Sequence, residues 1–162
     1  MNTRVGIGYD SHRFTAGRPL RIAGITVPHT HGLVGHSDGD VALHALIDAL
    51  LGAAALGDIG QHFPDDDPQW RGVDSARLLK KIVETLQQAG HSIVQVDITV
   101  LAERPKLAHM IGPMRAATAK ALGVAEGAVS IKAKTNEGMG WIGRGEGIAA
   151  MAVATIAQAA GG

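Results

Sequence analysis

The sequence predicts an α/β chain of the α+β type, with helices packed on one face of a mixed β-sheet. The 162 residues contain no linker, internal repeat or low-complexity tract, so we expect a single domain spanning residues 1–162. Strand-like and helix-like segments follow in the order β, α, α, β, α, β, and an alanine-rich tail closes the chain. Grouping the helices on one face of the sheet is the economical way to bury both kinds of apolar surface.

The N-terminal third predicts two β segments and the start of a helix. Residues Val5–Tyr9 alternate apolar side chains with glycine and lead into the polar cluster DSHR, as a strand does when it ends at a site. Residues Leu20–Val27 form a short β segment that Pro28 ends. Ser37, with Asp40 three residues later, has the form of a capping box, which places the helix start at Ser37.

This first helix is apolar on nearly every side as far as Leu51. Only Asp40, His44 and Asp48 interrupt it, each four residues after the last, so they lie on one stripe of the helix. The pattern predicts a buried helix that carries one narrow polar edge.

The remaining elements follow from periodicity and from helix-ending residues. A second helix runs from Asp74 as N-cap to Gly90, and residues 94–101 form a half-buried strand with Val94, Val96, Ile98 and Val100 facing inward. A third helix starts at Pro113 and ends at Gly123, and residues 129–134 form another strand. Alanine content favours a helix in the tail, Gly147–Ala160.

Composition excludes several function classes. Fifteen basic residues balance 15 acidic ones and aromatics make up 3%, so neither the charge nor the stacking surface of a nucleic-acid binder is present. The absence of cysteine excludes disulfides, thiolate metal sites and cysteine nucleophiles, and it fits a reducing cytoplasm. The N-terminus has no signal-peptide core, and His44 and Asp48 interrupt the most apolar stretch, so we expect no membrane segment.

The unusual feature of the composition is the combination of 22 glycines and eight histidines. Glycine lets backbone approach a ligand closely, but alanine and glycine can equally serve tight packing while the histidines lie on loops, and composition alone does not choose between the two.

Asp10 and His12 are two residues apart, so a strand that continues through them projects both side chains from one face. With His44 they supply the three protein ligands of a catalytic zinc site. A turn with His12 in solvent fits the spacing of the first two residues as well, and a satisfied core histidine fits His44. In the metal hypothesis Asp40 or Asp48 accepts a hydrogen bond from the second ring nitrogen of His44.

Three further segments could bind an anion or a cation. Residues 35–40, GHSDGD, place His36 and Ser37 at a helix N-terminus, where free amides favour an anion, although capping alone explains Ser37 and Asp40. The aspartate-rich loop 57–68 fits a solvated loop, or a site for sugar hydroxyls or a hard cation. The glycine-rich segment 133–147 lacks the Walker pattern but combines Thr135, Glu137 and Arg144, which suit phosphates and magnesium.

Together the segments YDSHRF, GHSDGDVALHALIDALLGAAALGDIG, HFPDDDP, AERPKLAHM and KTNEGMGWIGRGEG resemble the 2-C-methyl-D-erythritol 2,4-cyclodiphosphate synthase family of the non-mevalonate isoprenoid pathway. The resemblance runs from Val5 to the C-terminal segment in family order and spacing. It implies conversion of 4-diphosphocytidyl-2-C-methyl-D-erythritol 2-phosphate to the cyclic diphosphate, with release of CMP. The implied cofactors are one Zn²⁺ per subunit and a second divalent cation, Mg²⁺ or Mn²⁺.

The resemblance also implies a homotrimer with active sites between subunits, and an isoprenoid diphosphate at the trimer axis near Arg144 and Glu146. The resemblance also implies that the tail is a strand, although alanine favours a helix there. A strand at this position gives a β-α-β-α-β-β core. We adopt the strand here. A metal-dependent phosphohydrolase and a trimeric nucleotide-metabolite binding protein without activity are the rival functions.

Residue by residue, the resemblance implies three groups of site residues. The metal ligands are Asp10, His12, His44 and, for the second cation, Glu137, and the residues that stabilise the transition state are His36 and Thr135. The substrate contacts are Ser37, Asp58, Ile59, Gly60, Phe63, Pro64, Asp65, Asp66, Asp67, Ala102, Glu103, Arg104, Pro105, Lys106, Leu107, Ala108, Lys134, Asn136, Trp141 and Arg144. Asp66 and Lys134 stand where familiar members have threonine.

Overall fold

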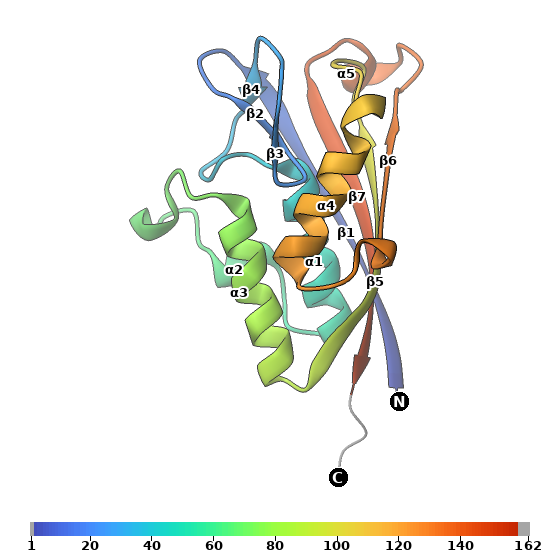
Figure 1. Cartoon of the computed structure of the whole chain (residues 1–162). Coiled ribbons are helices and arrows are strands. Elements are labelled where there is room, and N and C mark those ends of the chain that lie inside the picture. Colours follow the sequence, from blue (N-terminus) through green and yellow to red (C-terminus); the bar gives the residue numbers. More distant parts are fainter. Residues whose placement is uncertain (1, 159–162) are drawn as a thin grey trace.

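The computed structural model describes residues 2–158, in which three long helices cover one face of a five-stranded sheet (Figure 1). The strands are β1 (Asn2–Thr15), β2 (Leu20–Ile22), β3 (Ile25–Val27), β4 (Gly32–Leu33), β5 (His91–Leu101), β6 (Val129–Lys134) and β7 (Gly147–Gln158). The helices are α1 (Val41–Ala54), α2 (Ile59–His62), α3 (Ser75–Gln88), α4 (Ile111–Leu122) and α5 (Gly140–Gly143), with short 3₁₀ turns at Pro68–Trp70, Ala108–Met110 and Glu126–Ala128.

The large sheet has the strand order β4-β1-β7-β5-β6 and is mixed, as the sequence predicts. Strand β7 is antiparallel to both β1 and β5, whereas β5 and β6 are parallel. The strands β2 and β3 form a separate hairpin. Both described chain ends lie at the same end of the sheet, and the β2–β3 hairpin lies at the other (Figure 1).

The alanine-rich tail is a strand, which confirms the prediction from the resemblance and shows that the propensity of alanine misleads here. Strand β7 lies between β1 and β5, so the sheet satisfies its backbone on both sides. Its inward side chains include Ala150, Ala152 and Ala154, all at most 1% exposed, and their small size lets α1 approach the sheet. Residues 159–160 of the predicted segment lie outside the described residues.

Two glycines of β1 are explained by packing against α1. A Cβ atom at Gly8 would lie 1.9 Å from the carbonyl oxygen of Ala45, and one at Gly6 would lie 2.1 Å from that of Ala49. These two glycines therefore serve tight packing and not the approach to a ligand, because they are the surface on which the helix rests.

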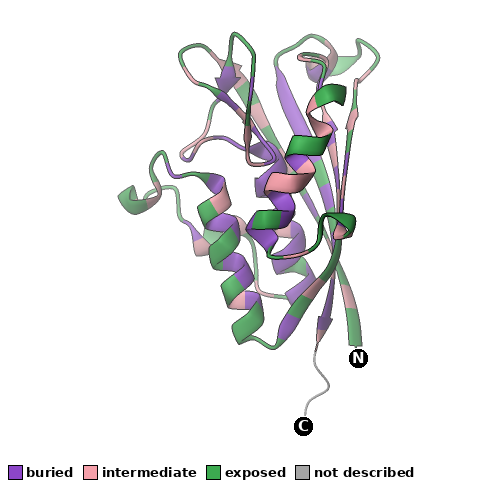
Figure 2. Ribbon diagram, viewed as in Figure 1, coloured by how far each residue is buried: buried purple, intermediate pink, exposed green. Residues whose placement is uncertain are grey.

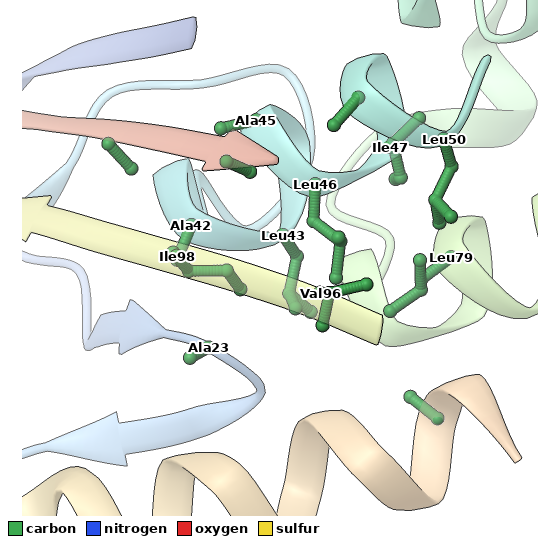
Figure 3. Close-up of a cluster of buried hydrophobic side chains, with 14 of the residues drawn as sticks. Ala23, Ala42, Leu43, Ala45, Leu46, Ile47, Leu50, Leu79, Val96 and Ile98 are labelled. Atoms are coloured by element: carbon green, nitrogen blue, oxygen red, sulfur yellow. The ribbon is translucent and has the colours of Figure 1, made fainter. Parts of the chain in front are cut away.

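Helix α1 is the centre of the core. Leu43, Leu46 and Leu50 are fully buried, and they cluster with Val96 and Ile98 of β5 and with Leu79 of α3 (Figure 3). Burying each such side chain contributes roughly 1.5–3 kcal/mol. In Figure 2 the buried residues of α3 lie toward α1 and its exposed residues face outward, as its predicted apolar face requires.

Helix α1 begins at Val41 and has Asp40 as its N-cap, so the predicted start and capping box at Ser37 are wrong. The Asp40 carboxylate accepts hydrogen bonds from the amides of Leu43 (3.1 Å), Ala23 (2.8 Å) and Gly24 (2.8 Å). It thus fixes the β2–β3 turn to the start of the helix. Complete burial raises the pKa of Asp40, and the nearby negative charge of Asp38 raises it further.

The predicted β segment Leu20–Val27 is two strands rather than one. The chain turns at Ala23 (φ 50°) and Gly24 (φ 83°), and β2 and β3 pair on either side. Glycine suits the left-handed conformation of this turn.

Other boundaries differ by small shifts. Strand β5 lies between β7 and β6, and a bulge between Ile93 and Gln95 leaves Val94 48% exposed instead of inward. Helix α4 starts at Ile111, two residues before the predicted Pro113, and ends at Gly123 with φ 71° as predicted. Asp74 caps α3, which confirms that prediction.

The face of the sheet opposite the helices presents apolar side chains to solvent. Val5, Ile7 and Tyr9 of β1 are 55–66% exposed, and Met151 and Val153 of β7 are 41–43% exposed. Among residues 2–158, no helix combines the length and the hydropathy that a membrane crossing requires.

Candidate active site

Three side chains converge where β1 passes the first turn of α1. Nε2 of His12 lies 2.7 Å from Oδ2 of Asp10, and Nδ1 of His44 lies 3.1 Å from both of these atoms. Strand β1 continues through Asp10 and His12 to Thr15, so the pair projects from one face as the sequence predicts. The strand excludes the turn with His12 in solvent. His44 is buried with polar partners at both ring nitrogens, as a satisfied core histidine requires, and its approach to Asp10 and His12 fits the metal hypothesis as well.

The three atoms have the spacing of a metal site. Ligand atoms about 2.0–2.1 Å from a tetrahedral zinc are roughly 3.3 Å apart, since a tetrahedron's edge is about 1.6 times its centre-to-corner distance. The observed separations are 2.7, 3.1 and 3.1 Å, so the three side chains need to move only slightly apart to reach that value. Two imidazoles and a carboxylate are also the donor set that suits zinc. Among the described residues, this cluster is a candidate metal site, and Glu137 is not part of it.

Electrostatics couple the three groups. Burial by itself would raise the pKa of Asp10, but hydrogen bonds to His12 and His44, and their positive charge, hold it at about 2. Burial by itself would lower the pKa of His12, but the hydrogen bond and charge of Asp10 raise it. A site that stabilises its carboxylate and a positive charge beside it is suited to a cation.

The second ring nitrogen of His44 contacts serines rather than an aspartate. Its Nε2 lies 2.9 Å from Oγ of Ser75 and 3.0 Å from Oγ of Ser37. The predicted partners Asp40 and Asp48 are therefore both wrong: Asp40 caps α1, and Asp48 accepts from the amide of Ile59 at 2.8 Å. Ser75 was missed because its position follows from how α3 crosses α1.

A pocket of about 320 Å³ opens over the three-residue cluster. Six predicted site residues outside the cluster line it, namely His36, Ser37, Ile59, Gly60, Phe63 and Asp65. Four lining residues were not predicted, namely Val34, Gly35, Trp70 and Leu78. Trp70 packs edge-on against Phe63, with ring centroids 5.0 Å apart. The aromatic pair was hidden in sequence by the aspartate run between its members.

The aspartate-rich loop serves partly to hold itself in place. Asp58 caps α2 through the amide of Gln61 (3.0 Å), and Asp67 caps the following 3₁₀ turn through the amide of Gln69 (3.0 Å). The main-chain carbonyl of Asp67 lies 3.3 Å from Nε2 of His36. Of the predicted contacts in this loop, Asp58, Pro64, Asp66 and Asp67 do not line the pocket.

A second pocket, of about 600 Å³, lies at the edge of the sheet that β6 forms, beside α4. Its lining includes seven of the site residues that the resemblance implies: Ala102, Pro105, Lys106, Leu107, Ala108, Lys134 and Thr135. Glu103 and Arg104 belong to the predicted run but do not line it. The Glu103 carboxylate accepts from the amides of Asn136 (2.9 Å) and Gly138 (2.8 Å), so it holds the loop that bears Thr135.

The glycine-rich segment forms a turn between β6 and β7. Glu137 has φ 52°, and its carboxylate is 3.5 Å from the hydroxyl of Thr135. Trp141 of α5 borders a third hollow together with Ser11 and His12, and Arg144 pairs with Glu146 at 3.3 Å. This segment therefore extends from the second pocket, which Thr135 lines, to the hollow that Trp141 borders beside β1.

The two main pockets belong to different edges of the sheet. The metal cluster is on β1 and the second pocket is beside β6, and strands β7 and β5 lie between them. Three strand spacings amount to roughly 14 Å.

Comparison with known proteins decides the family, since the model of the YgbB family matches residues 3–157. The chain belongs to the YgbB family. The 2-C-methyl-D-erythritol 2,4-cyclodiphosphate synthase of Salinibacter ruber is 56% identical over 156 residues, covering 96% of this chain and 99% of that protein. The enzyme of the same name from Bordetella petrii is 58% identical over 156 residues, covering 96% of each chain.

Solved structures agree with this membership in the YgbB family. A 2C-methyl-D-erythritol-2,4-cyclodiphosphate synthase in a CDP-bound form superposes with a TM-score of 0.87 at 36% identity, covering 95% of this chain and all of that one. The bifunctional IspDF of Campylobacter jejuni superposes with a TM-score of 0.93 at 39% identity. The present chain matches over 97% of its own length and spans 42% of that longer protein.

Proposed function

We propose that this chain is a 2-C-methyl-D-erythritol 2,4-cyclodiphosphate synthase, a phosphorus–oxygen lyase of isoprenoid biosynthesis. The observation that carries the proposal is the Asp10, His12 and His44 cluster at the base of a pocket, in a chain more than half identical to synthases of that name. The substrate is 4-diphosphocytidyl-2-C-methyl-D-erythritol 2-phosphate.

The metal at the cluster is zinc in this proposal, because two imidazoles and one carboxylate leave a fourth position open. Glu137 would hold the second cation, Mg²⁺ or Mn²⁺. Bound divalent cations supply Lewis-acid polarisation of phosphoryl oxygens and neutralise developing charge. They also supply positive charge for an anionic substrate that a chain with no net charge does not provide.

The reaction needs no nucleophile from the protein. An oxygen of the substrate's 2-phosphate bonds to its β-phosphorus, the bond from that phosphorus to the bridging oxygen breaks, and CMP departs with the bridging oxygen. The chain's task is to hold both ends of one substrate in line, and such positioning is worth on the order of 7–11 kcal/mol.

Residues in and beside the first pocket divide this task among them. Asp58, whose carboxylate already accepts a hydrogen bond at the start of α2, accepts from the hydroxyls of the erythritol, while Ile59, Gly60 and the loop Phe63–Asp67 enclose it. Ser37 binds the substrate beside His44, and His36 stabilises the transition state.

The second pocket binds the cytidine. Its apolar alanine, proline and leucine side chains suit a base, and Lys106 and Lys134 suit the phosphates. Thr135 stabilises the transition state, and Glu103, Arg104, Asn136, Trp141 and Arg144 complete the substrate contacts, with Glu103 acting through the loop that it holds. The CDP-bound relative supports a nucleotide role for this fold.

A homotrimer completes the site. The exposed apolar face of β1 and β7 has the chemistry of a subunit interface, and the separation of the two pockets within one chain favours a site shared between neighbours. In this proposal Arg144 and Glu146 of each subunit surround a trimer axis that accepts an isoprenoid diphosphate. We place the enzyme in the cytoplasm, and the absence of cysteine fits that compartment.

Mass spectrometry of the products tests the proposal directly. The purified protein, supplied with Zn²⁺ and Mg²⁺, is expected to convert the CDP-methylerythritol phosphate substrate to CMP and a cyclic diphosphate in equal amounts. Release of inorganic phosphate would indicate a phosphohydrolase instead. Retention of intact substrate on the protein would indicate a binding protein.

A further inference from the structure

The imidazole of His44 has a different environment at each ring nitrogen. Nδ1 faces Asp10 and His12, whereas Nε2 faces the hydroxyls of Ser75 and Ser37 at 2.9 and 3.0 Å. His44 is 9% exposed, and Ser75 is fully buried. A neutral imidazole carries one ring proton, and its ability to bind a metal through Nδ1 requires that the proton be on Nε2.

The proton of the Ser75 hydroxyl is directed away from His44. Oγ of Ser75 lies 2.5 Å from Oδ1 of Asp38, and an ionised carboxylate only accepts hydrogen bonds, so Ser75 donates to Asp38. The serine oxygen then has only lone pairs left for His44. The contact of 2.9 Å therefore requires that Nε2 carry the ring proton and donate it.

Asp38 is itself held in position by donors at both carboxylate oxygens. Its Oδ2 accepts from the amide of Ser75 and its Oδ1 from the amide of Asp40, both at 3.1 Å, while Nε of Arg21 lies 3.7 Å from Oδ2. Both carboxylate oxygens therefore act as acceptors, and the Ser75 hydroxyl is the donor in its contact with Oδ1. The direction of the chain from His44 through Ser75 to Asp38 is thereby fixed.

Ser37 does not set this direction. Its hydroxyl accepts from the amide of Gly39 at 3.4 Å and lies 3.4 Å from Oγ of Ser75, but no carboxylate of the described residues accepts from it. Ser37 can therefore follow whichever proton position His44 adopts.

We propose that Asp38 and Ser75 are positioning residues that fix the tautomer and the orientation of His44, so that Nδ1 presents its lone pair to the metal. This inference rests on the metal site of the proposed function. Neither residue contacts the metal or the substrate in the proposal. A purely structural role, in which Asp38 only braces the start of α3, predicts lower stability but unchanged metal binding.

Zinc affinity, measured by chelator competition at fixed pH, separates the two roles. Loss of such a partner typically weakens metal binding about 10–100-fold, and we expect this range for Ser75→Ala and Asp38→Asn. Ser92→Ala is the matched control, because that hydroxyl makes one long bond of 3.4 Å to the carbonyl of Ala157 at the far end of β5. It is expected to match the wild type. The melting temperature of each metal-free variant reports structural damage separately.

A measurement on the wild type keeps the inference testable if Ser75→Ala does not fold. In the zinc-loaded protein, nitrogen-15 NMR is expected to show a slowly exchanging ring proton on Nε2 of His44. A proton on Nδ1 instead would overturn the inference, as would zinc affinities of Ser75→Ala and Asp38→Asn equal to that of the wild type. If the wild type itself binds no zinc, the proposed metal site is wrong. If the wild type and both variants bind zinc equally well, the metal site stands and only the role of Asp38 and Ser75 is wrong.

Discussion

Nε2 of His12 and Nδ1 of His44 lie 3.1 Å apart, a distance at which two ring nitrogens cannot both carry a proton. Oδ2 of Asp10 lies within the same distance of each. Lone pairs that converge in this way are stabilised by one shared cation, whether a proton or a metal ion.

His44→Ala removes one of the three ligands, and we expect zinc affinity to fall more than ~100-fold, beyond the loss expected for an outer partner. Turnover is expected to fall on the order of 10³-fold or more, since polarisation of the phosphoryl oxygen is worth several kcal/mol. Elemental analysis and steady-state assays check both. The exposed His109→Ala is the control for loss of a histidine and should keep full zinc content. Stoichiometric zinc in His44→Ala would show that His44 is not a ligand.

Zinc binding is expected to weaken as the pH falls, because the metal must displace the proton of His12. Asp10 raises the pKa of His12 above the ordinary 6.5, so the protonated form persists to higher pH than in an isolated histidine. With Asp10 titrating at about 2, that carboxylate stays ionised across the working range. Below the raised pKa we expect affinity to fall about tenfold per pH unit, and above it to level off. Chelator competition at closely spaced pH values measures the profile, and a midpoint below 6.5 would contradict it.

The stability of the metal-free protein is expected to fall as the pH rises, whereas its zinc affinity is expected to increase. A histidine whose pKa is raised on folding stabilises the folded state below the unfolded value of 6.5, and that contribution disappears as the pH rises through the raised pKa. Thermal unfolding with a chelator present should therefore show stability falling as the pH rises through this window. The effect should be absent in His12→Asn.

Gly8→Ala is expected to destabilise the protein by at least ~3 kcal/mol, because the added Cβ would meet the backbone oxygen of Ala45 at 1.9 Å. Backbone cannot move aside as a flexible side chain can. Gly112→Ala in α4 is the matched control, since a Cβ there meets nothing within 4 Å and alanine should stabilise the helix by roughly 0.5–1 kcal/mol. Denaturant unfolding measures both, and equal effects would show that β1 and α1 are not in close contact.

Much of the fold could be predicted because its signals are local. The apolar face of α3, the alternation in β5 and the glycine at the end of α4 each report on their own segment. The tail was different: alanine favours helix in isolation, and only the pairing of β7 with both neighbours overrides that preference. Likewise, nothing local shows that Gly6 and Gly8 support a helix about 40 residues away.

The site divides in the same way. The spacing of Asp10 and His12 on one strand gives their common face, and a histidine in an apolar helix calls for a partner. Which partner it finds depends on how α3 crosses α1, and this brings Ser75 to His44 instead of the aspartates on the same helix stripe. Long-range contacts of this kind have no periodic signal in the sequence.

Ile7→Asp is expected to convert the proposed trimer to monomers, because Ile7 is 66% exposed at the centre of the apolar sheet face and a buried aspartate would lack a partner there. Turnover should fall by more than ~10-fold as the shared site is lost. Zinc binding should persist, because Asp10, His12 and His44 belong to one chain. Analytical ultracentrifugation measures the assembly. Gln87→Lys, on the exposed side of α3, is the control and should leave it unchanged. Active monomers would refute the shared site.

Mixing two inactive variants gives the sharpest test of a site built from two subunits. His44→Ala damages the metal half of the site. Glu137→Ala damages the loop after β6, which belongs to the nucleotide half, so each variant alone should be inactive. In trimers reassembled from equal amounts of both, a site is intact only when its metal half comes from the Glu137→Ala chain and its nucleotide half from the His44→Ala chain. Random assembly produces that combination at about one quarter of the interfaces, and we expect about one quarter of wild-type activity. Product assays after co-refolding measure the recovery. If each site were contained in a single subunit, every site would carry one of the two lesions and no activity would return.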